Sequence, residues 1–153
     1  MTSIDGFDDA ADDFAEFAEN LREFAARTDE AVDDGVEDTA LQIEGTAKEH
    51  APVETGNLRS SISHRRIDIA EFIVGTPVEY APDVEFGTQP HPITPNGDDP
   101  LTFKVDDEWV STYHVDHPGT PAQPFLRKAL RQHQSDLSRN IQQSINALVR
   151  EIF

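Results

Sequence analysis

A helix-ending segment followed by a tight turn, residues 51–62, constrains this chain more than any other feature. Pro52 cannot continue a helix, and it favours an extended backbone at Ala51. Gly56 can adopt a positive φ without steric cost, so Thr55–Asn57 is predicted to be a tight turn. The segment therefore predicts that a helix ends near residue 50 and that a strand begins soon after the turn.

The N-terminal third of the chain has the spacing of an amphipathic helix. Apolar residues recur every three or four positions from Phe7 to Ala47, and acidic residues occupy the other face. Much of the apolar stripe is alanine, which favours packing on a sheet over a coiled coil. Gly35 and Gly45 lower helix propensity, and a kink or break near Gly35 is compatible with the pattern. Residues 1–6 are expected to fray.

The middle of the chain has the composition of strands and turns. Residues 58–69 and 70–75 predict one hairpin, and residues 101–105 and 109–115 predict a second around Asp106–Glu108. Between them, residues 81–86 fit a single helical turn with Pro82 at its start. Residues 89–100 are rich in Pro, Gly, Asn and Asp, and we expect a mobile loop there.

The last third of the chain predicts a long helix. Pro124 fits its first turn, and an apolar face continues from Leu126 to Ile152. No repeat or domain linker interrupts the sequence. We therefore predict one domain over residues 1–153 with an α+β fold, in which an antiparallel sheet of two hairpins packs against a long N-terminal helix and a long C-terminal helix.

The chain is strongly acidic, with 30 Asp and Glu against 12 Lys and Arg and a net charge of −18. An ordinary acidic protein that repels nucleic acid is one interpretation. Adaptation to very high salt is the other, because a Debye length of about 3 Å near 1 M salt reduces the self-repulsion. The abundance of Asp and the scarcity of Lys favour the second.

The charge is unevenly distributed along the chain. Residues 1–49 hold sixteen acidic and three basic residues, whereas residues 121–153 hold two acidic and five basic ones. The two segments could pack against each other within one subunit. They could also meet between neighbouring copies, or against the acidic face of a partner. The sequence leaves these alternatives open.

Residue patterns that would indicate chemistry are missing from the sequence. There is no Cys, and therefore no disulfide, thiolate metal site or Cys nucleophile. On a strand, His114 and His117 would face opposite sides, so we expect no metal site. Adjacent acids such as Asp12–Asp13 are typical of a solvated surface, and no serine elbow or phosphate loop occurs. We predict no catalytic residue, no metal and no cofactor.

The sequence also argues against two kinds of partner. No apolar run is long enough to span a bilayer, and the N-terminus lacks the features of a signal peptide, so no membrane contact is expected. Arg59, Arg65 and Arg66 form the main basic cluster outside the last helix. Sequence-specific binding of nucleic acid needs a basic stripe on a basic domain, and this chain has the opposite sign.

Three segments, in order and at fitting separations, resemble the neck or head–tail joining (tail completion) proteins of long-tailed double-stranded DNA viruses. The N-terminal helix and residues 89–100 depart from that pattern. The residues that carry the resemblance are Ala51, Pro52, Thr55, Gly56, Leu58, Ser61 and Ile62; Tyr80, Ala81, Pro82, Val84, Glu85, Phe86, Gly87 and Thr88; and Pro121, Gln123, Pro124, Phe125, Leu126, Arg127, Ala129 and Leu130.

The resemblance implies a structural virion protein, made in the host cytoplasm, with no catalytic activity. It implies a closed ring of copies of the chain in the neck, between the portal-side connector or head-closure protein and the tail terminator or tail tube. Such a ring helps to complete the tail and to retain the genome, and double-stranded DNA passes it without sequence-specific contact. An acidic lumen would let DNA pass without sticking.

Rigid, turn-rich segments would make good ring contacts, because little entropy is lost when they dock. Phe86 and Phe125 could instead be core residues, and we favour the core for Phe125. The interface residues that the resemblance suggests are Glu54, Thr55, Gly56, Asn57, Arg59, Glu85, Gly87, Thr88, Pro121, Gln123 and Arg127.

Other functions remain open from the sequence. A tail terminator or a minor head protein of the same virus is the nearest alternative. A soluble acidic binding protein or regulator outside the virion, an enzyme, and a dimeric antitoxin-like module that uses the C-terminal helix are more distant ones. An enzyme would need a pocket of convergent polar groups, which the motifs do not supply.

Overall fold

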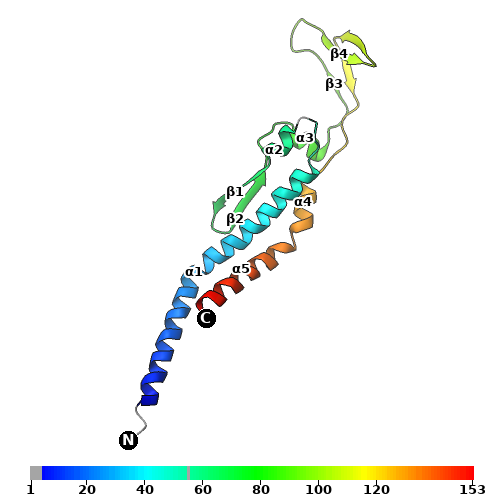
Figure 1. Cartoon of the computed structure of the whole chain (residues 1–153). Coiled ribbons are helices and arrows are strands. Elements are labelled where there is room, and N and C mark those ends of the chain that lie inside the picture. The colour runs from blue at the N-terminus through cyan, green and yellow to red at the C-terminus, as the bar shows by residue number, and fades with distance from the viewer. Residues whose placement is uncertain (1–4, 55) are drawn as a thin grey trace.

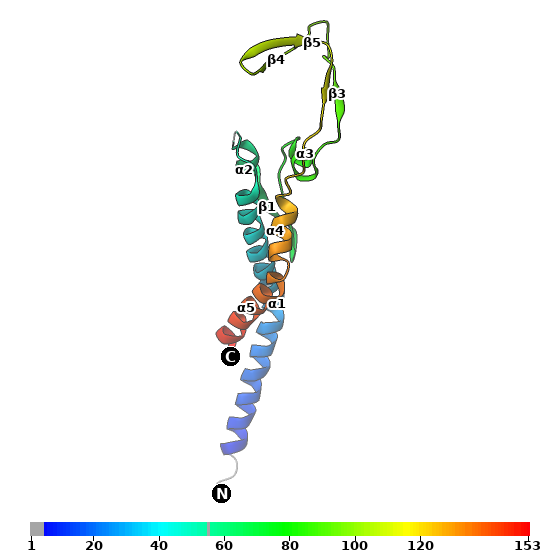
Figure 2. The same ribbon diagram turned by 90° about the vertical axis from the view of Figure 1, so that its right-hand side faces the viewer.

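The structure of the chain is a computed structural model that describes residues 5–54 and 56–153, with side chains described from Asp9 onward. It has the predicted α+β composition, with a long N-terminal helix, C-terminal helices and antiparallel pairs of strands (Figure 1). The molecule is elongated: helices form its long axis, and a strand-rich arm extends from one end (Figures 1 and 2).

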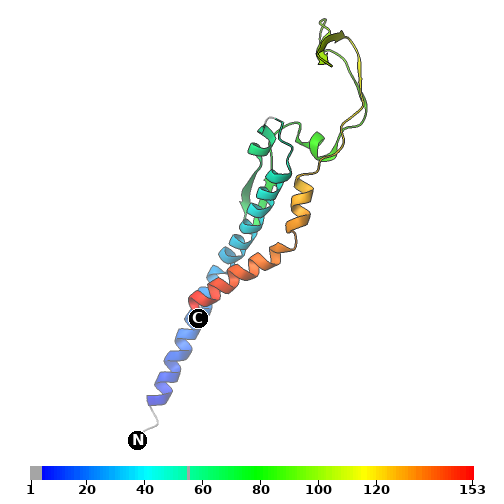
Figure 3. The same ribbon diagram turned by 45° about the vertical axis from the view of Figure 1, so that its right-hand side comes forward.

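Helix α1, Asp5–His50, runs through both glycines without a break, so the break considered near Gly35 does not occur. It packs mainly along the C-terminal helices and carries a strand hairpin on another side (Figures 1 and 3). Its packing partners are therefore chiefly helices, and the expectation of a helix packed on a sheet is only partly correct. Pro52 ends the helix as predicted, and the backbone N–H of Ala51 still donates to Ala47 O at 2.9 Å.

Residues 58–61 form a helical turn, α2 (Asn57–Ser61), and the strand predicted there begins later. Leu58 and Ile62 are buried, whereas Ser60 between them is exposed. A strand would place all three on one face, while a helical turn brings residues four apart to the same side and turns Ser60 away. The hydroxyls of Ser60 and Ser61 donate to the carbonyls of Asn57 and Leu58. These local bonds favour the turn over a strand ladder.

Within residues 5–54 and 56–153, three separate two-stranded ribbons replace a single sheet. Strands β1 (Ser63–Asp68) and β2 (Glu71–Gly75) form the first predicted hairpin, next to α1. Strands β4 (Leu101–Val105) and β5 (Glu108–Thr112) form the second, around a turn in which Asp106 and Asp107 have positive φ. Strands β3 (His91–Ile93) and β6 (Val115–His117) form a third ribbon. Strand β3 lies within the segment predicted to be a loop. The sequence pattern did not indicate this strand, because its pairing partner, β6, is more than twenty positions away.

Helix α3, Ala81–Phe86, confirms the predicted helical turn with Pro82 at its start. The C-terminal helix, in contrast, is two helices: α4 (Leu126–His133) and α5 (Asp136–Ile152). His133 Nδ1 lies 2.8 Å from Asp136 Oδ2, and His133 Nε2 lies 2.7 Å from Thr46 Oγ1 of α1. These bonds hold the bend that lays α5 along α1 (Figure 3).

Helices α1 and α5 approach each other closely at Gly35. A Cβ at this position would lie 2.5 Å from Ile141 Cα, so only glycine allows the observed distance between the helices. Beside it, the buried amide of Asn140 donates to Thr39 Oγ1 at 2.9 Å, and Thr39 donates to Gly35 O at 2.9 Å. The glycine that suggested a break is thus a packing contact.

We predict that Gly35→Ala lowers the free energy of unfolding by about 1–3 kcal/mol, because the new methyl group forces the two helix backbones apart. Gly45→Ala is the matched control, since a Cβ at that position meets no atom within 4 Å. It should raise the free energy of unfolding by up to about 1 kcal/mol through helix propensity. Chemical denaturation measures both, and equal effects of the two substitutions would contradict the account.

Candidate functional site

The three segments that carry the sequence resemblance meet in space and form the core of the protein. The core cluster lies where the end of α1, α2, α3 and the start of α4 come together. Phe125 is fully buried there, as expected, whereas Phe86 is 65% exposed. Except for Ala47, every buried residue of the cluster belongs to one of the three segments: Ala51, Leu58, Ile62, Ala81, Phe125 and Ala129.

A buried carboxylate, that of Glu85 on α3, joins two of these segments. It accepts hydrogen bonds from the backbone N–H groups of Phe125 (2.7 Å), Leu126 (2.9 Å) and Arg127 (3.1 Å). The Arg127 side chain donates to the same carboxylate through Nε at 2.8 Å and to the Glu85 carbonyl oxygen at 2.7 Å. The first N–H groups of a helix have no partner within the helix, so this carboxylate caps α4 from a distant part of the chain. We call this contact the Glu85 junction.

The electrostatics of the Glu85 junction favour the charged carboxylate. Burial alone would raise the pKa of Glu85, because it removes water from the charge. The hydrogen bonds from Arg127 and from the three backbone N–H groups outweigh burial and lower the pKa below its ordinary value. Glu85 is therefore ionised at neutral pH despite an exposed fraction of 4%.

Gly87 and Thr88 continue the junction beyond α3. Gly87 has φ +75°, and a Cβ there would lie 2.6 Å from Thr120 O. Thr88 and Thr120 form an antiparallel bridge with backbone bonds of 2.9 and 3.2 Å. The backbone N–H of Gln123 donates to Val84 O at 2.8 Å. The backbones of residues 84–88 and 120–123 thus already bind each other within one subunit.

Several predicted interface residues surround a hollow of about 490 Å³ between the α1–α2 connection and α3. Its lining includes Glu54, Gly56, Asn57 and Gln123, together with the exposed ring of Tyr80. The structure brings these predicted residues together, although they come from segments far apart in sequence. Thr55 lies outside the described residues. Arg59 and Pro121 are exposed but do not line this hollow.

Glu44 forms a second, partly buried ionic cluster, which the sequence did not suggest. Its carboxylate accepts from Lys48 and lies within hydrogen-bond distance of the ring and the backbone N–H of His64 on β1. The bond from Lys48 is the largest influence, and with those from His64 it overcomes burial and lowers the pKa of Glu44 to about 2. The cluster fastens β1 to α1.

One arrangement has the order of a nucleophile, a base and an orienting acid: Thr46, His133 and Asp136. Thr46 is buried on the face of α1 that meets α4, with an exposed fraction of 9%, so a substrate has no access to its hydroxyl. The His133 ring instead bridges α1 and the start of α5. This geometry accounts for the bend between α4 and α5.

The histidines considered as metal ligands are also separated by the structure. His117 lies opposite His91 across the β3–β6 ribbon, with ring centroids 5.1 Å apart, while His114 pairs with Asp116 at 2.9 Å. Among the described residues, no three His, Cys, Asp or Glu side chains form a group that could hold a metal ion. No described helix has the length and apolar character that crossing a bilayer requires.

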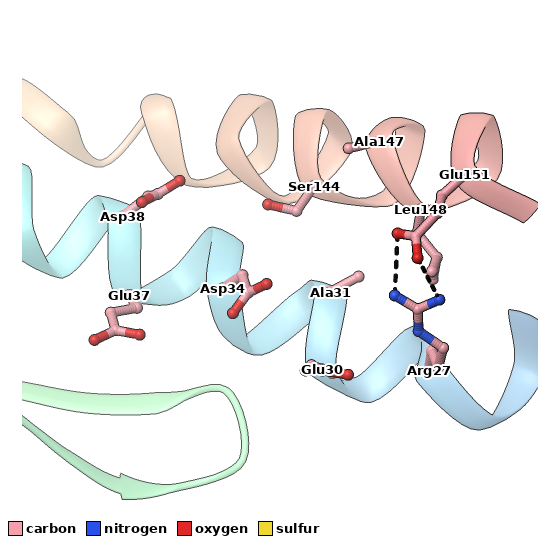
Figure 4. A pocket seen from close by; sticks show the side chains of 10 residues that line it. All are labelled: Arg27, Glu30, Ala31, Asp34, Glu37, Asp38, Ser144, Ala147, Leu148 and Glu151. Atoms are coloured by element: carbon pink, nitrogen blue, oxygen red, sulfur yellow. Dashed lines mark hydrogen bonds and ion pairs between the residues drawn. The ribbon is translucent and has the colours of Figure 1, made fainter.

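An acidic groove of about 380 Å³ lies between parts of α1 and α5 (Figure 4). Asp34 and Asp38 of α1 lie along it, and the bidentate pair of Arg27 with Glu151, at 2.9 and 3.1 Å, closes one end. Arg27 belongs to the acidic segment, residues 1–49, and Glu151 belongs to the basic segment, residues 121–153. This described ion pair between the two segments therefore has the reverse of the polarity that their net charges suggest. The acidic and basic segments pack together in one subunit without pairing their surplus charges.

Part of the chain that forms this core matches a known protein family. Residues 15–87 match the HK97-gp10-like family, described as "Bacteriophage HK97-gp10, putative tail-component". The match runs from α1 through α3, so it includes Glu85 and Gly87 and two of the three core segments. It confirms, for this part of the chain, the resemblance to proteins of the head–tail region of tailed phages. No curated protein and no solved structure matches the chain.

Sequence reasoning grouped the right segments but missed what joins them. Glu85 and Arg127 were both selected as interface residues, yet their contact with each other spans forty-two positions. No periodicity connects such distant positions, because the contact depends on how α3 and α4 pack. An acid two positions before a glycine in the second segment, and a helix start without a local capping side chain in the third, were the available signals.

We predict that Glu85→Gln lowers the free energy of unfolding by about 3 kcal/mol, since it leaves the Arg127 guanidinium without its buried partner and places an amide N–H₂ among donors. Glu79→Gln, an exposed acid on the same connection, is the control and should change stability by less than about 0.5 kcal/mol. Denaturant unfolding measures both. A value for Glu85→Gln within the range of the control would contradict the capping role.

Proposed function

We propose that the chain is a structural virion protein of the neck, which joins the DNA-filled head to the tail. The observation that carries this proposal is the match of residues 15–87 to a phage tail component, a match that ends within the structural core described above. The whole chain, residues 1–153, acts as one head–tail joining unit. Several copies form a closed ring that helps to complete the tail and to retain the packaged genome.

The partners of such a ring are its own neighbouring copies, the portal-side connector or head-closure protein, and the tail terminator or tail tube. The hollow lined by Glu54, Gly56, Asn57 and Gln123 supports a rim contact, because it brings predicted interface residues from distant segments to one place on the surface. DNA passing through the ring makes no sequence-specific contact. The net charge of −18 supports this point, since it repels phosphate groups.

The role is structural, and we propose no catalysis, metal or cofactor. The hydroxyl of the one nucleophile-like arrangement noted above, Thr46, is buried between helices. The depressed pKa values of Glu44 and Glu85 arise from bonds that hold elements together. The lowered pKa values of these two carboxylates therefore have a structural explanation and do not indicate an active site.

A tail terminator is the second candidate, because the family description names a tail component without placing it. Chemical cross-linking of intact particles separates the two. A neck protein cross-links to both a portal-side protein and a tail protein, whereas a terminator, which lies on the tail side of the neck ring, does not cross-link to a portal-side protein.

We predict that purified virus particles contain about six or about twelve copies of the chain, the numbers that a closed cyclic ring in a tail would favour. Quantitative mass spectrometry of particles, calibrated on the portal protein, measures this number. Absence of the chain from particles contradicts the proposed function.

We also propose that the virus infects a host that lives at high salt and that the acidic surface is adapted to it. We predict that the free energy of unfolding rises as salt increases from about 0.15 M to about 1 M, because screening weakens repulsion between acids such as Asp12, Asp13 and Glu16 on α1. Thermal unfolding at graded salt measures the effect. A flat stability profile contradicts this proposal and leaves the neck role unaffected.

A further inference from the structure

Residues 91–117, which we call the arm, project from the helical body as two strand ribbons (Figures 1 and 2). The bridge between Thr88 and Thr120 marks the point where the arm leaves the body. The strands of the arm pair with each other and have few contacts with any helix. A two-stranded ribbon by itself is only marginally stable in water. The arm therefore has the form of an element that is supported by contact with another surface.

The tip of the arm exposes a large apolar side chain next to acids. Trp109 is 72% exposed and pairs with Lys104 across the β4–β5 ribbon, on the face opposite Phe103 and Val110. The apolar side chains of the hairpin therefore do not cover it. The turn before it contains Asp106, Asp107 and Glu108. An exposed tryptophan is the kind of side chain that anchors protein interfaces.

An apolar groove that could receive this side chain lies on the body, along α4. Two adjoining hollows, of about 400 and 260 Å³, share Leu126 and Arg127. The first extends to Phe86, which is 65% exposed, and the second extends to Phe72 and to Leu130, which is 52% exposed. Together they form a strip between β2, α3 and α4, which we call the α4 groove. Its largely apolar lining suits an aromatic anchor.

The charges next to the two surfaces are complementary. The arm carries six acidic residues and one base, Lys104. The exposed cations Lys128 and Arg131 of α4 have no acidic partner among the ion pairs of the described residues. Opposite charges beside an apolar contact fix its orientation and speed its formation.

The arm of the same chain extends away from its own α4, so it does not fill this groove within one subunit (Figures 1, 2 and 3). We propose that Trp109 of one copy inserts into the α4 groove of the next copy, with the Asp106–Glu108 turn facing Arg131. The two surfaces differ, so the contact is heterologous, and its repetition generates a ring when the rotation closes. This inference rests on the proposed ring and specifies the contact that builds it.

The absence of cysteine from the chain allows a direct test with the full-length protein. Asp107→Cys and Arg131→Cys are prepared separately, mixed and oxidised, which leaves Trp109 in place. Disulfides form only when the two Cα atoms come within about 7 Å, so a heterodimer reports the proposed contact. Asp13→Cys mixed with Arg131→Cys is the control, because Asp13 is an exposed acid on α1. Heterodimer in excess over the control supports the proposal, and equal or no heterodimer overturns it.

A second measurement uses Trp109 as the only tryptophan of the chain. As the concentration of the wild-type protein rises, we expect self-association in sedimentation velocity together with a blue shift of the tryptophan emission. Trp109→Ser should raise the dissociation constant about tenfold or more, the effect expected of an interface anchor. Phe14→Ser removes an aromatic ring of similar exposure, 75%, from α1, and it should leave association unchanged. Association that is lost in Phe14→Ser but kept in Trp109→Ser overturns the proposal.

The two proposals fail in different experiments. If the disulfide between Asp107→Cys and Arg131→Cys forms but virus particles contain no copies of the chain, the contact is supported and the neck role is rejected. If particles contain the chain but this disulfide does not form in the purified protein, the neck role is supported and the contact is rejected.

Discussion

The fold depends most on one buried carboxylate, that of Glu85, at the start of α4. A buried charge is costly unless it is paired and hydrogen-bonded, and here backbone N–H groups and the Arg127 side chain satisfy it. The bond network ties α3 to α4 across about forty residues of intervening chain. Because the arm leaves the body between these two helices, the same contact determines where the arm begins. The helices and the arm are thus positioned by a single polar junction inside an apolar core.

Charge has two separate roles in this protein. Inside the body, ion pairs such as those of Glu44 and Glu85 fasten one element to another. On the surface, the basic C-terminal segment packs against acidic α1 without pairing its surplus cations, and Arg27 with Glu151 even has the reverse polarity. Lys128 and Arg131 therefore remain available for contacts outside the subunit. The acidic and basic segments can therefore pack together within one subunit and still make contacts between copies, so the two alternatives that the sequence left open are compatible.

Local patterns predicted the parts of the fold that local chemistry determines. The helix end at Pro52, the short helix at Pro82, the Asp106–Asp107 turn and the burial of Phe125 were all predictable from the sequence. The strand β3, the bend between α4 and α5 and the close contact at Gly35 depend on partners far away in the chain, and local reasoning could not place them. The three motif segments were recognised as important, but they were interpreted as an interface. The structure shows that their apolar residues form the core, while some of their polar residues line a hollow at its rim.

The central claim is that Glu85 caps α4 inside a single subunit, so that the motif segments form a core before any assembly occurs. Native-state hydrogen exchange of the backbone N–H groups of Phe125, Leu126 and Arg127 tests this claim most directly. Helix-start amides exposed to water exchange rapidly, whereas amides bound to a buried carboxylate exchange only when the structure opens. The account predicts protection of all three at the level of core amides such as that of Ala129. Fast exchange at these positions in the folded, unassembled protein would contradict it.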